Sequence, residues 1–348
     1  MQTQADWLRR RAELRTLLLG CIYGPLPPTP ASVRWELLHD ATVRSEDARL
    51  HGARLITGRV HCVGLATDEP TPPIALQIWL PGASAEPDTK RGSHHPVILH
   101  GDACWHYSTD EVKAQVLSRG YALAEFNRVE IAADPPLASP SDWVRPTQGF
   151  ARYGAIAAWA WGFHRCVDAL VQLPFISAGQ IAVVGHSRGG KAALLAGATD
   201  ERIAITSANN SGAAGAGSFQ HRGEDAETLA NIANAFPHWF GPEVRHFAHH
   251  ERELPVDSHC LKALIAPRAL LTTEALGDLW ANPEGTRRTH EAAREVFKWL
   301  EAEGNIALRE REGGHAHFLS DWVALLGFSD RVFNKNSHIP SWNGDSLL

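Results

Sequence analysis

Ser187 stands near the centre of residues 181–191 (IAVVGHSRGGK), with Gly185 and Gly189 two positions away on either side. A serine with this spacing can lie on a tight turn from a strand to a helix, because larger flanking side chains would collide with the turn. The turn presents the hydroxyl above a sheet, and the helix that follows directs its first N–H groups at a developing oxyanion. The alternative is a glycine-rich loop with an incidental serine. The apolar run before Ser187 and the alanine-rich run after it favour a nucleophile for acyl transfer.

A serine hydroxyl is a weak nucleophile at neutral pH and requires a neighbouring base. In enzymes that use such a turn, an acid and then a histidine follow the serine along the chain. Residues 312–317 (EGGHAH) follow the last expected strand and hold two candidates. We select His315, since two glycines before it let the loop enter the site, and keep His317 as the rival. A histidine pair of this kind can also bind a metal, but the sequence offers no third ligand at suitable spacing, so we expect neither metal nor cofactor.

The acid must orient the histidine and stabilise its protonated form. It should follow the strand expected at 269–273, where Glu274 and Asp278 are available. Asp278 comes after a glycine, in a loop that can turn toward the site. Glu274 lies closer to the end of the strand, where a structural role is the alternative. We therefore expect Asp278 to be the acid of a Ser187–His315–Asp278 triad.

These residues need a sheet whose strands end at one edge. After two antiparallel strands, short apolar strands alternate with helical segments, which predicts a mostly parallel sheet covered by helices on both faces. The expected fold is the α/β-hydrolase fold, in one domain over residues 1–348 with a substrate-side insertion at about 212–265. We expect strands at 54–65, 74–80, 96–100, 121–126, 181–185, 203–208, 269–273 and 306–310, and helices before Gly24, near 109–119, and at 152–173, 189–198, 286–303 and 319–326.

Composition excludes several classes of protein. The 348 residues are 44% apolar and 21% charged, with a formal net charge of −6. A negative balance argues against a nucleic-acid partner, and the sequence has no apolar run of the roughly 18 residues that a membrane span needs. The arginines and short apolar stretch of the first 24 residues indicate an amphipathic helix rather than a signal peptide. We favour a cytoplasmic protein, with a periplasmic or secreted mature protein as the alternative.

Several ordered blocks resemble one family, the glucuronoyl esterases of carbohydrate esterase family 15, in their bacterial form. The blocks extend over nearly the whole chain and include 185–191 (GHSRGGK), 209–212 (NNSG), 236–240 (FPHWF), 254–259 (LPVDSH), 278–283 (DLWANP) and 313–315 (GGH). The resemblance implies hydrolysis of esters of 4-O-methyl-glucuronic acid, a small-molecule or oligosaccharide substrate. It also implies that Ser187 is the nucleophile, His315 the base, and Arg188 the cation that helps to hold the oxyanion.

The resemblance further implies that Lys191, Glu224 and Trp280 contact the uronate sugar. The alternatives are a solvated helix residue for Lys191, a surface residue for Glu224 and a core residue for Trp280. In some family members the acid of the triad is a glutamate at the position of Asn210. Asparagine cannot serve as a carboxylate, so the acid is expected at the family's second position, which Asp278 matches. The chain departs from the family at 212–215 (GAAG), in the substrate-side insertion.

Two other functions remain open. One is a carbohydrate acetylesterase or a carboxylesterase of broad specificity, which would use the same triad. The other is a non-catalytic carbohydrate-binding relative, which the complete serine, aspartate and histidine set argues against.

Overall fold

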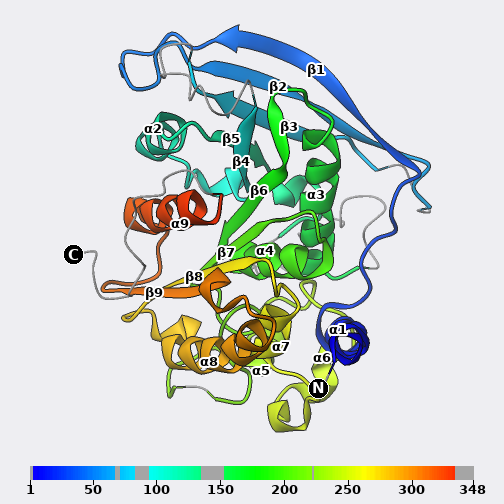
Figure 1. Cartoon of the computed structure of the whole chain (residues 1–348). Helices are drawn as coiled ribbons and strands as arrows, with labels where there is room; N and C mark the ends of the chain where they lie inside the picture. The colour runs from blue at the N-terminus through cyan, green and yellow to red at the C-terminus, as the bar shows by residue number, and fades with distance from the viewer. Residues whose placement is uncertain (1–2, 67–70, 83–93, 135–152, 222, 334–348) are drawn as a thin grey trace.

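A single sheet organises the protein. The computed structural model describes residues 3–66, 71–82, 94–134, 153–221 and 223–333. Within them nine strands lie in the order β1-β2-β3-β5-β4-β6-β7-β8-β9 (Figure 1). The neighbours from β1 to β5 in this order are antiparallel, and every pair from β5 to β9 is parallel. The strands are β1 Ser32–Thr42, β2 Arg54–Val63, β3 Ile74–Leu80, β4 His95–His100, β5 Ala122–Phe126, β6 Ile176–His186, β7 Ile205–Asn209, β8 Ala269–Ala275 and β9 Ile306–Arg311.

Helices cover both faces of this sheet, as expected. In β4, Val97 and Leu99 pack into one core with α1, α3, α4, α7 and α8, whereas Ile98 packs into a second core with α2 and α9. Strands buried on both faces have apolar side chains at consecutive positions, which is the pattern of a parallel sheet between two helical layers. The predicted fold class is therefore confirmed. The helices are α1 Gln4–Leu18, α2 Asp110–Ser118, α3 Ala155–Leu170, α4 Arg188–Thr199, α5 Leu229–Ala235, α6 Val244–Phe247, α7 Ser258–Ala263, α8 Pro283–Trp299 and α9 Leu319–Val332.

The sequence analysis does not predict β1. This strand forms one edge of the sheet, and most of its residues are exposed. Charged and apolar residues therefore mix along it without the alternation that marks a half-buried strand. Several other elements extend beyond their predicted bounds, and the start expected for the helix at 152–173 lies outside the described residues.

The segment between β7 and β8 carries α5, α6 and α7 and lies beside the N-terminal helix (Figure 1). The N–H of Gly241 donates to the carbonyl of Ile22 (2.9 Å), and the buried hydroxyl of Tyr23 donates to the carbonyl of Ala214 (2.8 Å). A short π-helix, η1 Leu19–Tyr23, makes this connection. The N-terminal region thus fixes the segment that approaches the carboxyl ends of the strands.

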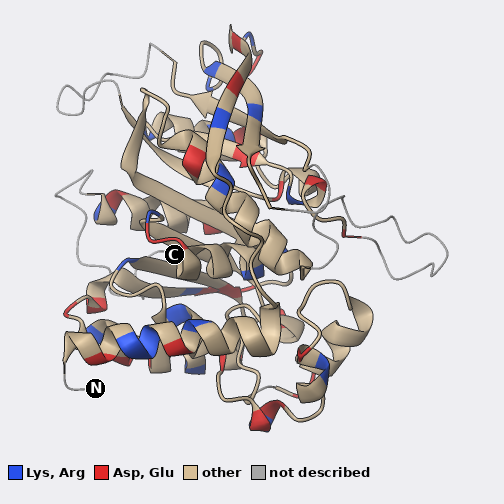
Figure 2. Cartoon of the chain, turned by 90° about the vertical axis from the view of Figure 1, so that its right-hand side faces the viewer, with Lys and Arg blue, Asp and Glu red and all other residues tan. Residues whose placement is uncertain are grey.

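Acidic and basic residues are interspersed along the described elements (Figure 2). Along α1, Arg9 pairs with Asp6 (2.5 Å) and Arg10 with Glu13 (3.2 Å). No described helix combines the length and the hydropathy that crossing a membrane requires.

Candidate active site

Ser187 occupies the sharp turn between β6 and α4. Its backbone has φ 54° and ψ −123°, a conformation that an L-residue adopts only at a cost of about 1–3 kcal/mol. The N–H of Ser187 donates to the carbonyl of Asn209 on the neighbouring strand (2.8 Å), which holds the turn against the sheet. A Cβ at Gly185 would overlap the backbone of Gly189, and a Cβ at Gly189 would overlap the carboxylate of Asp102. Both glycines are therefore required for the turn to close.

His315 and Asp278 meet on the loops that follow β9 and β8. His315 Nδ1 lies 2.5 Å from Asp278 Oδ2. The aspartate side chain is 4% exposed and the histidine 43% exposed. Since the Nδ1–H donates to the carboxylate, Nε2 is left as the basic nitrogen that can accept a proton. These two residues thus form the histidine–aspartate hydrogen bond that a triad requires, and the His315 side chain stays partly open to solvent.

His186, the residue before Ser187, packs against the base. Its ring centroid lies 4.6 Å from that of His315. His186 Nδ1 donates to Asn209 Oδ1 (2.5 Å), because the Asn209 amide nitrogen is itself a donor to Thr273 Oγ1 (2.8 Å). Burial, together with the neighbouring His315, lowers the pKa of His186 to about 4. A neutral imidazole therefore lies next to the base at neutral pH.

His317, the rival base, is partly buried, and Glu274, the rival acid, is fully buried. The ring of His317 stacks on Trp322 (4.9 Å, 22°) behind His186, and burial lowers its pKa. Glu274 is fully buried in β8, where burial, with a contribution from the Asp278 charge, raises its pKa to about 8. A neutral carboxyl stabilises an imidazolium less than a carboxylate does. These contacts favour His315 and Asp278 over their rivals.

Arg188 begins α4, directly after Ser187. Its Nη1 donates to Asp134 Oδ2 (3.0 Å), and its guanidinium lies over the rings of Phe236 (4.8 Å) and Trp239 (4.7 Å). The side chain is 25% exposed. A fixed cation and the first N–H groups of α4 thus lie beside the serine, where an oxyanion would form.

Lys191 is buried, one helical turn beyond Ser187. Its ammonium donates to the carbonyls of Ser211 (2.8 Å) and Ala213 (2.5 Å) and to Glu227 Oε1 (2.5 Å). These three bonds use all three N–H donors of an ammonium group. Within the described residues Lys191 thus holds Glu227, and the sugar contact that the resemblance implies for Lys191 stays a prediction.

Two acidic residues of the insertion differ in their surroundings. Glu224 is exposed, as in the surface position considered for it, and the sugar contact that the resemblance implies for it stays a prediction. Glu227 is 6% exposed and pairs with Lys191, and its backbone N–H donates to the carbonyl of Trp280 (3.0 Å). Sequence reasoning missed Glu227, because only the contact with a buried lysine distinguishes it from the carboxylates beside it. Trp280 is 51% exposed, which excludes the core position considered for it.

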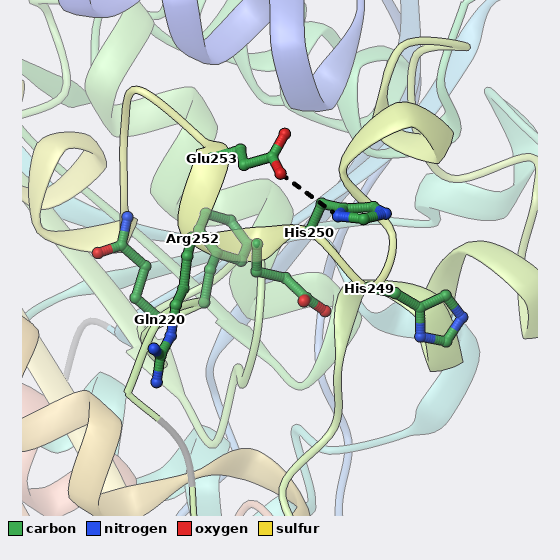
Figure 3. Close-up of a pocket in the computed structure, with 7 residues that line it drawn as sticks. Gln220, His249, His250, Arg252 and Glu253 are labelled. Carbon is green, nitrogen blue, oxygen red and sulfur yellow. Dashed lines mark ion pairs between the residues drawn. The ribbon is translucent and has the colours of Figure 1, made fainter.

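A separate pocket lies on the insertion (Figure 3). It is lined by residues 249–253 together with Phe219 and Gln220, and Figure 3 shows the exposed ion pair between His250 and Glu253 at its rim (3.4 Å). None of the residues described above lines it. We assign it no part in catalysis.

Known proteins resemble this chain over most of its length. The family model described as "Glucuronyl esterase, fungi" matches residues 107–301, more than half of the chain. Carbohydrate esterase MZ0003, from an unknown prokaryotic organism, is 33% identical over 92% of this chain and 84% of its own length. The 4-O-methyl-glucuronoyl methylesterase of Cerrena unicolor is 29% identical over 91% of this chain, which spans 63% of that relative.

A solved structure agrees with these sequence matches. A carbohydrate esterase family 15 glucuronoyl esterase from Caldicellulosiruptor kristjansonii is similar with a TM-score of 0.77 and 30% identity, over 99% of this chain and 93% of that one. With a serine on the turn after β6 and a histidine–aspartate pair on the loops after β9 and β8, the chain belongs to the glucuronoyl esterase family, carbohydrate esterase family 15, whose members are carboxylic ester hydrolases of the α/β-hydrolase fold.

Proposed function

We propose that the enzyme hydrolyses esters of 4-O-methyl-glucuronic acid through an acyl-enzyme on Ser187. The observation that carries this proposal is the 2.5 Å hydrogen bond between His315 and Asp278, on loops beside the strained turn of Ser187. A general base held by a buried carboxylate is what an unactivated serine needs. The name of the Cerrena unicolor relative supports the choice of sugar.

In the proposed reaction, His315 Nε2 accepts the hydroxyl proton while Ser187 Oγ attacks the ester carbonyl. Negative charge then develops on the carbonyl oxygen, near Arg188 and the first N–H groups of α4, which stabilise it more in the transition state than in the neutral ester. His315 returns the proton to the departing alcohol, and the uronic acid remains bound to Ser187 as an ester. Water, activated by the same histidine, releases the acid.

The sugar carries the carboxyl that is attacked, so its ring must lie close to Ser187. Glu227, held by Lys191, and the exposed indole of Trp280 are the groups proposed to meet it. A carboxylate can accept hydrogen bonds from sugar hydroxyls, and an indole can pack against the apolar face of a ring. Lys191 contributes by holding Glu227 in place, and we propose Glu227 rather than Glu224 for the sugar contact.

Comparison of substrates tests this proposal. We expect a higher kcat/KM for methyl 4-O-methyl-glucuronate than for an acetylated xyloside or an aryl acetate, measured on one preparation. The broader alternative, a carbohydrate acetylesterase or carboxylesterase, is compatible with the name of carbohydrate esterase MZ0003, which specifies no ester. Faster hydrolysis of either acetate would select that alternative, and no hydrolysis of any ester would select a non-catalytic relative.

Two further expectations from the sequence belong to this proposal. We treat residues 1–348 as one catalytic domain, with residues 212–265 as the substrate-side insertion that supplies Glu227. The cytoplasmic location remains an expectation, which fractionation of the native cells would test.

A further inference from the structure

Asp134 is a buried carboxylate that gathers hydrogen bonds from three parts of the chain. Its Oδ2 accepts from Arg188 Nη1 (3.0 Å) and from Arg128 Nη1 (3.4 Å). Its Oδ1 accepts from the indole N–H of Trp239 (2.9 Å) and lies 3.2 Å from His238 Nε2. The side chain is only 2% exposed. It follows β5 by eight residues and is thus remote in sequence from Arg188, on α4.

These neighbours keep Asp134 ionised. Burial alone would raise the pKa of its carboxyl group, but the hydrogen bonds from His238 and Trp239 and the charges of Arg188 and Arg128 hold that pKa well below its usual range. A buried carboxylate with four donors has its desolvation offset by charge-assisted hydrogen bonds. Asp134 therefore presents a fixed negative charge to the Arg188 guanidinium at neutral pH.

The same contacts fix the surface on which Arg188 lies. The rings of Phe236 and Trp239 are stacked (3.9 Å, 4°), and the guanidinium lies over both. Trp239 contacts the guanidinium with its ring and holds the Asp134 carboxylate with its N–H. The N terminus of α3 anchors this platform, since the N–H groups of Ala155 and Ile156 donate to the carbonyls of His238 (2.8 Å) and Trp239 (3.2 Å).

We propose that Asp134 is a positioning residue, which holds the Arg188 guanidinium at the oxyanion site before substrate arrives. The inference rests on the proposed function, because it assumes that Arg188 stabilises the oxyanion. An arginine side chain has several rotatable bonds, and ordering it during the reaction would reduce what it contributes to the transition state. A carboxylate on one side and an aromatic platform on the other restrict it to one arrangement.

Asp134 could either hold the Arg188 guanidinium in place or weaken its positive charge. These two roles predict opposite results for the isosteric change Asp134→Asn. If the carboxylate mainly diminishes the positive charge of Arg188, its removal should raise kcat. If it mainly holds the guanidinium, as we propose, kcat should fall by at least about tenfold, the effect of losing one charge-assisted hydrogen bond. KM should change little, because the oxyanion exists only after the attack.

A double-mutant cycle tests whether Asp134 acts through Arg188. Asp134→Asn is measured alone and in an Arg188→Gln background, with methyl glucuronate and with an aryl acetate. We expect a large loss of kcat in the parent background and almost none in the Arg188→Gln background, for whichever of the two esters the parent hydrolyses. Equal losses in both backgrounds, a gain in kcat, or a change confined to the melting temperature would overturn the inference.

Control variants separate positioning from folding. Asp330→Asn removes a buried carboxylate that accepts hydrogen bonds from Arg119 (2.9 Å) and Tyr121 (2.8 Å). These two residues precede the amino end of β5 and so lie at the end of the strands opposite to the active site. It should lower the melting temperature with kcat retained. If Asp134→Asn does not fold, His238→Asn replaces it in the double-mutant cycle, because it removes one hydrogen bond to the Asp134 carboxylate. We then expect a loss of kcat in the parent background and almost none in the Arg188→Gln background. A parent enzyme that is inactive on methyl glucuronate but active on the aryl acetate would refute the proposed substrate, while the cycle on the acetate still decides the role of Asp134.

Discussion

His315 Nδ1 lies 2.5 Å from Asp278 Oδ2 although 37 positions separate the two residues in the sequence. Backbone hydrogen bonds join their loops, since Leu276 N–H donates to the carbonyl of Arg311 (2.8 Å) and Gly277 N–H to that of Gly313 (3.0 Å). The loops thus continue the pairing of β8 with β9 for two residues past the strands. The position of the base is therefore set by the sheet itself, and this arrangement leads to the following predictions.

Replacing the acid should slow turnover strongly. Asp278→Asn leaves the shape of the side chain unchanged but presents an amide to His315, so the imidazolium loses its carboxylate and the tautomer is no longer fixed. We expect kcat to fall by roughly a thousandfold or more. Glu274→Gln, the matched control, should leave kcat within a few-fold, because Glu274 is neutral at pH 7 and does not contact the base. Steady-state rates in which Glu274→Gln is the slower of the two would reverse the assignment.

Glu274→Gln should also change how stability depends on pH. The folded pKa of Glu274 is about 8, against 4.5 for the exposed group. Below pH 4.5 both states hold the proton, and the group contributes no pH dependence. Between pH 4.5 and 8 the unfolded chain releases its proton and the folded chain does not, so the free energy of unfolding falls as pH rises. Glutamine removes this fall.

The stability difference between Glu274→Gln and the parent should therefore shift in favour of the variant from pH 5 to pH 8, by on the order of 3 kcal/mol. Urea denaturation at the two pH values measures this shift. A difference that stayed constant, or that moved toward the parent, would mean that Glu274 is ionised in the folded protein.

Glu227 should contribute to the recognition of the sugar. Glu227→Gln should reduce kcat/KM for methyl glucuronate more than for an aryl acetate, by roughly 1–3 kcal/mol if one buried hydrogen bond is lost. Glu224→Gln is the matched control and should affect neither substrate, since its side chain is exposed. Equal losses on both substrates in Glu227→Gln would assign Glu227 to the support of the turn at Ser187 and leave the uronate without its proposed contact.

Lys191→Ala should mainly destabilise the protein. Its removal leaves Glu227 buried without a counter-charge and frees the carbonyls of Ser211 and Ala213, so we expect a loss of about 3–5 kcal/mol. Thermal and urea denaturation measure this loss. A variant of parental stability would show that Lys191 and Glu227 are not a structural pair.

The sequence predicts the fold from local order, and the same local order is the basis of the predicted triad. The turn at Ser187 requires Gly185 and Gly189, and the alternation of apolar strands with helices leaves few topologies. Chain order places Asp278 and His315 after β8 and β9. The glycines before these two residues, rather than chain order, distinguish them from Glu274 and His317.

The surroundings of the triad were harder to predict, because they depend on contacts between distant segments. Glu227 becomes distinct from Glu224 only when Lys191 is seen to be buried beside it. Asp134 lies far from Arg188 in sequence, and no spacing rule joins them. The edge strand β1 lacks the burial that gives other strands their pattern.

The rate of ester hydrolysis by Ser187→Ala tests the central claim most directly. Alanine retains the Cβ, so the strained turn and its glycine contacts are unchanged, and the melting temperature should match that of the parent. We predict that kcat/KM for methyl 4-O-methyl-glucuronate falls to below about one-thousandth of the parent value, the usual cost of losing a triad member. A folded Ser187→Ala protein that retains more activity than this would contradict Ser187 as the nucleophile.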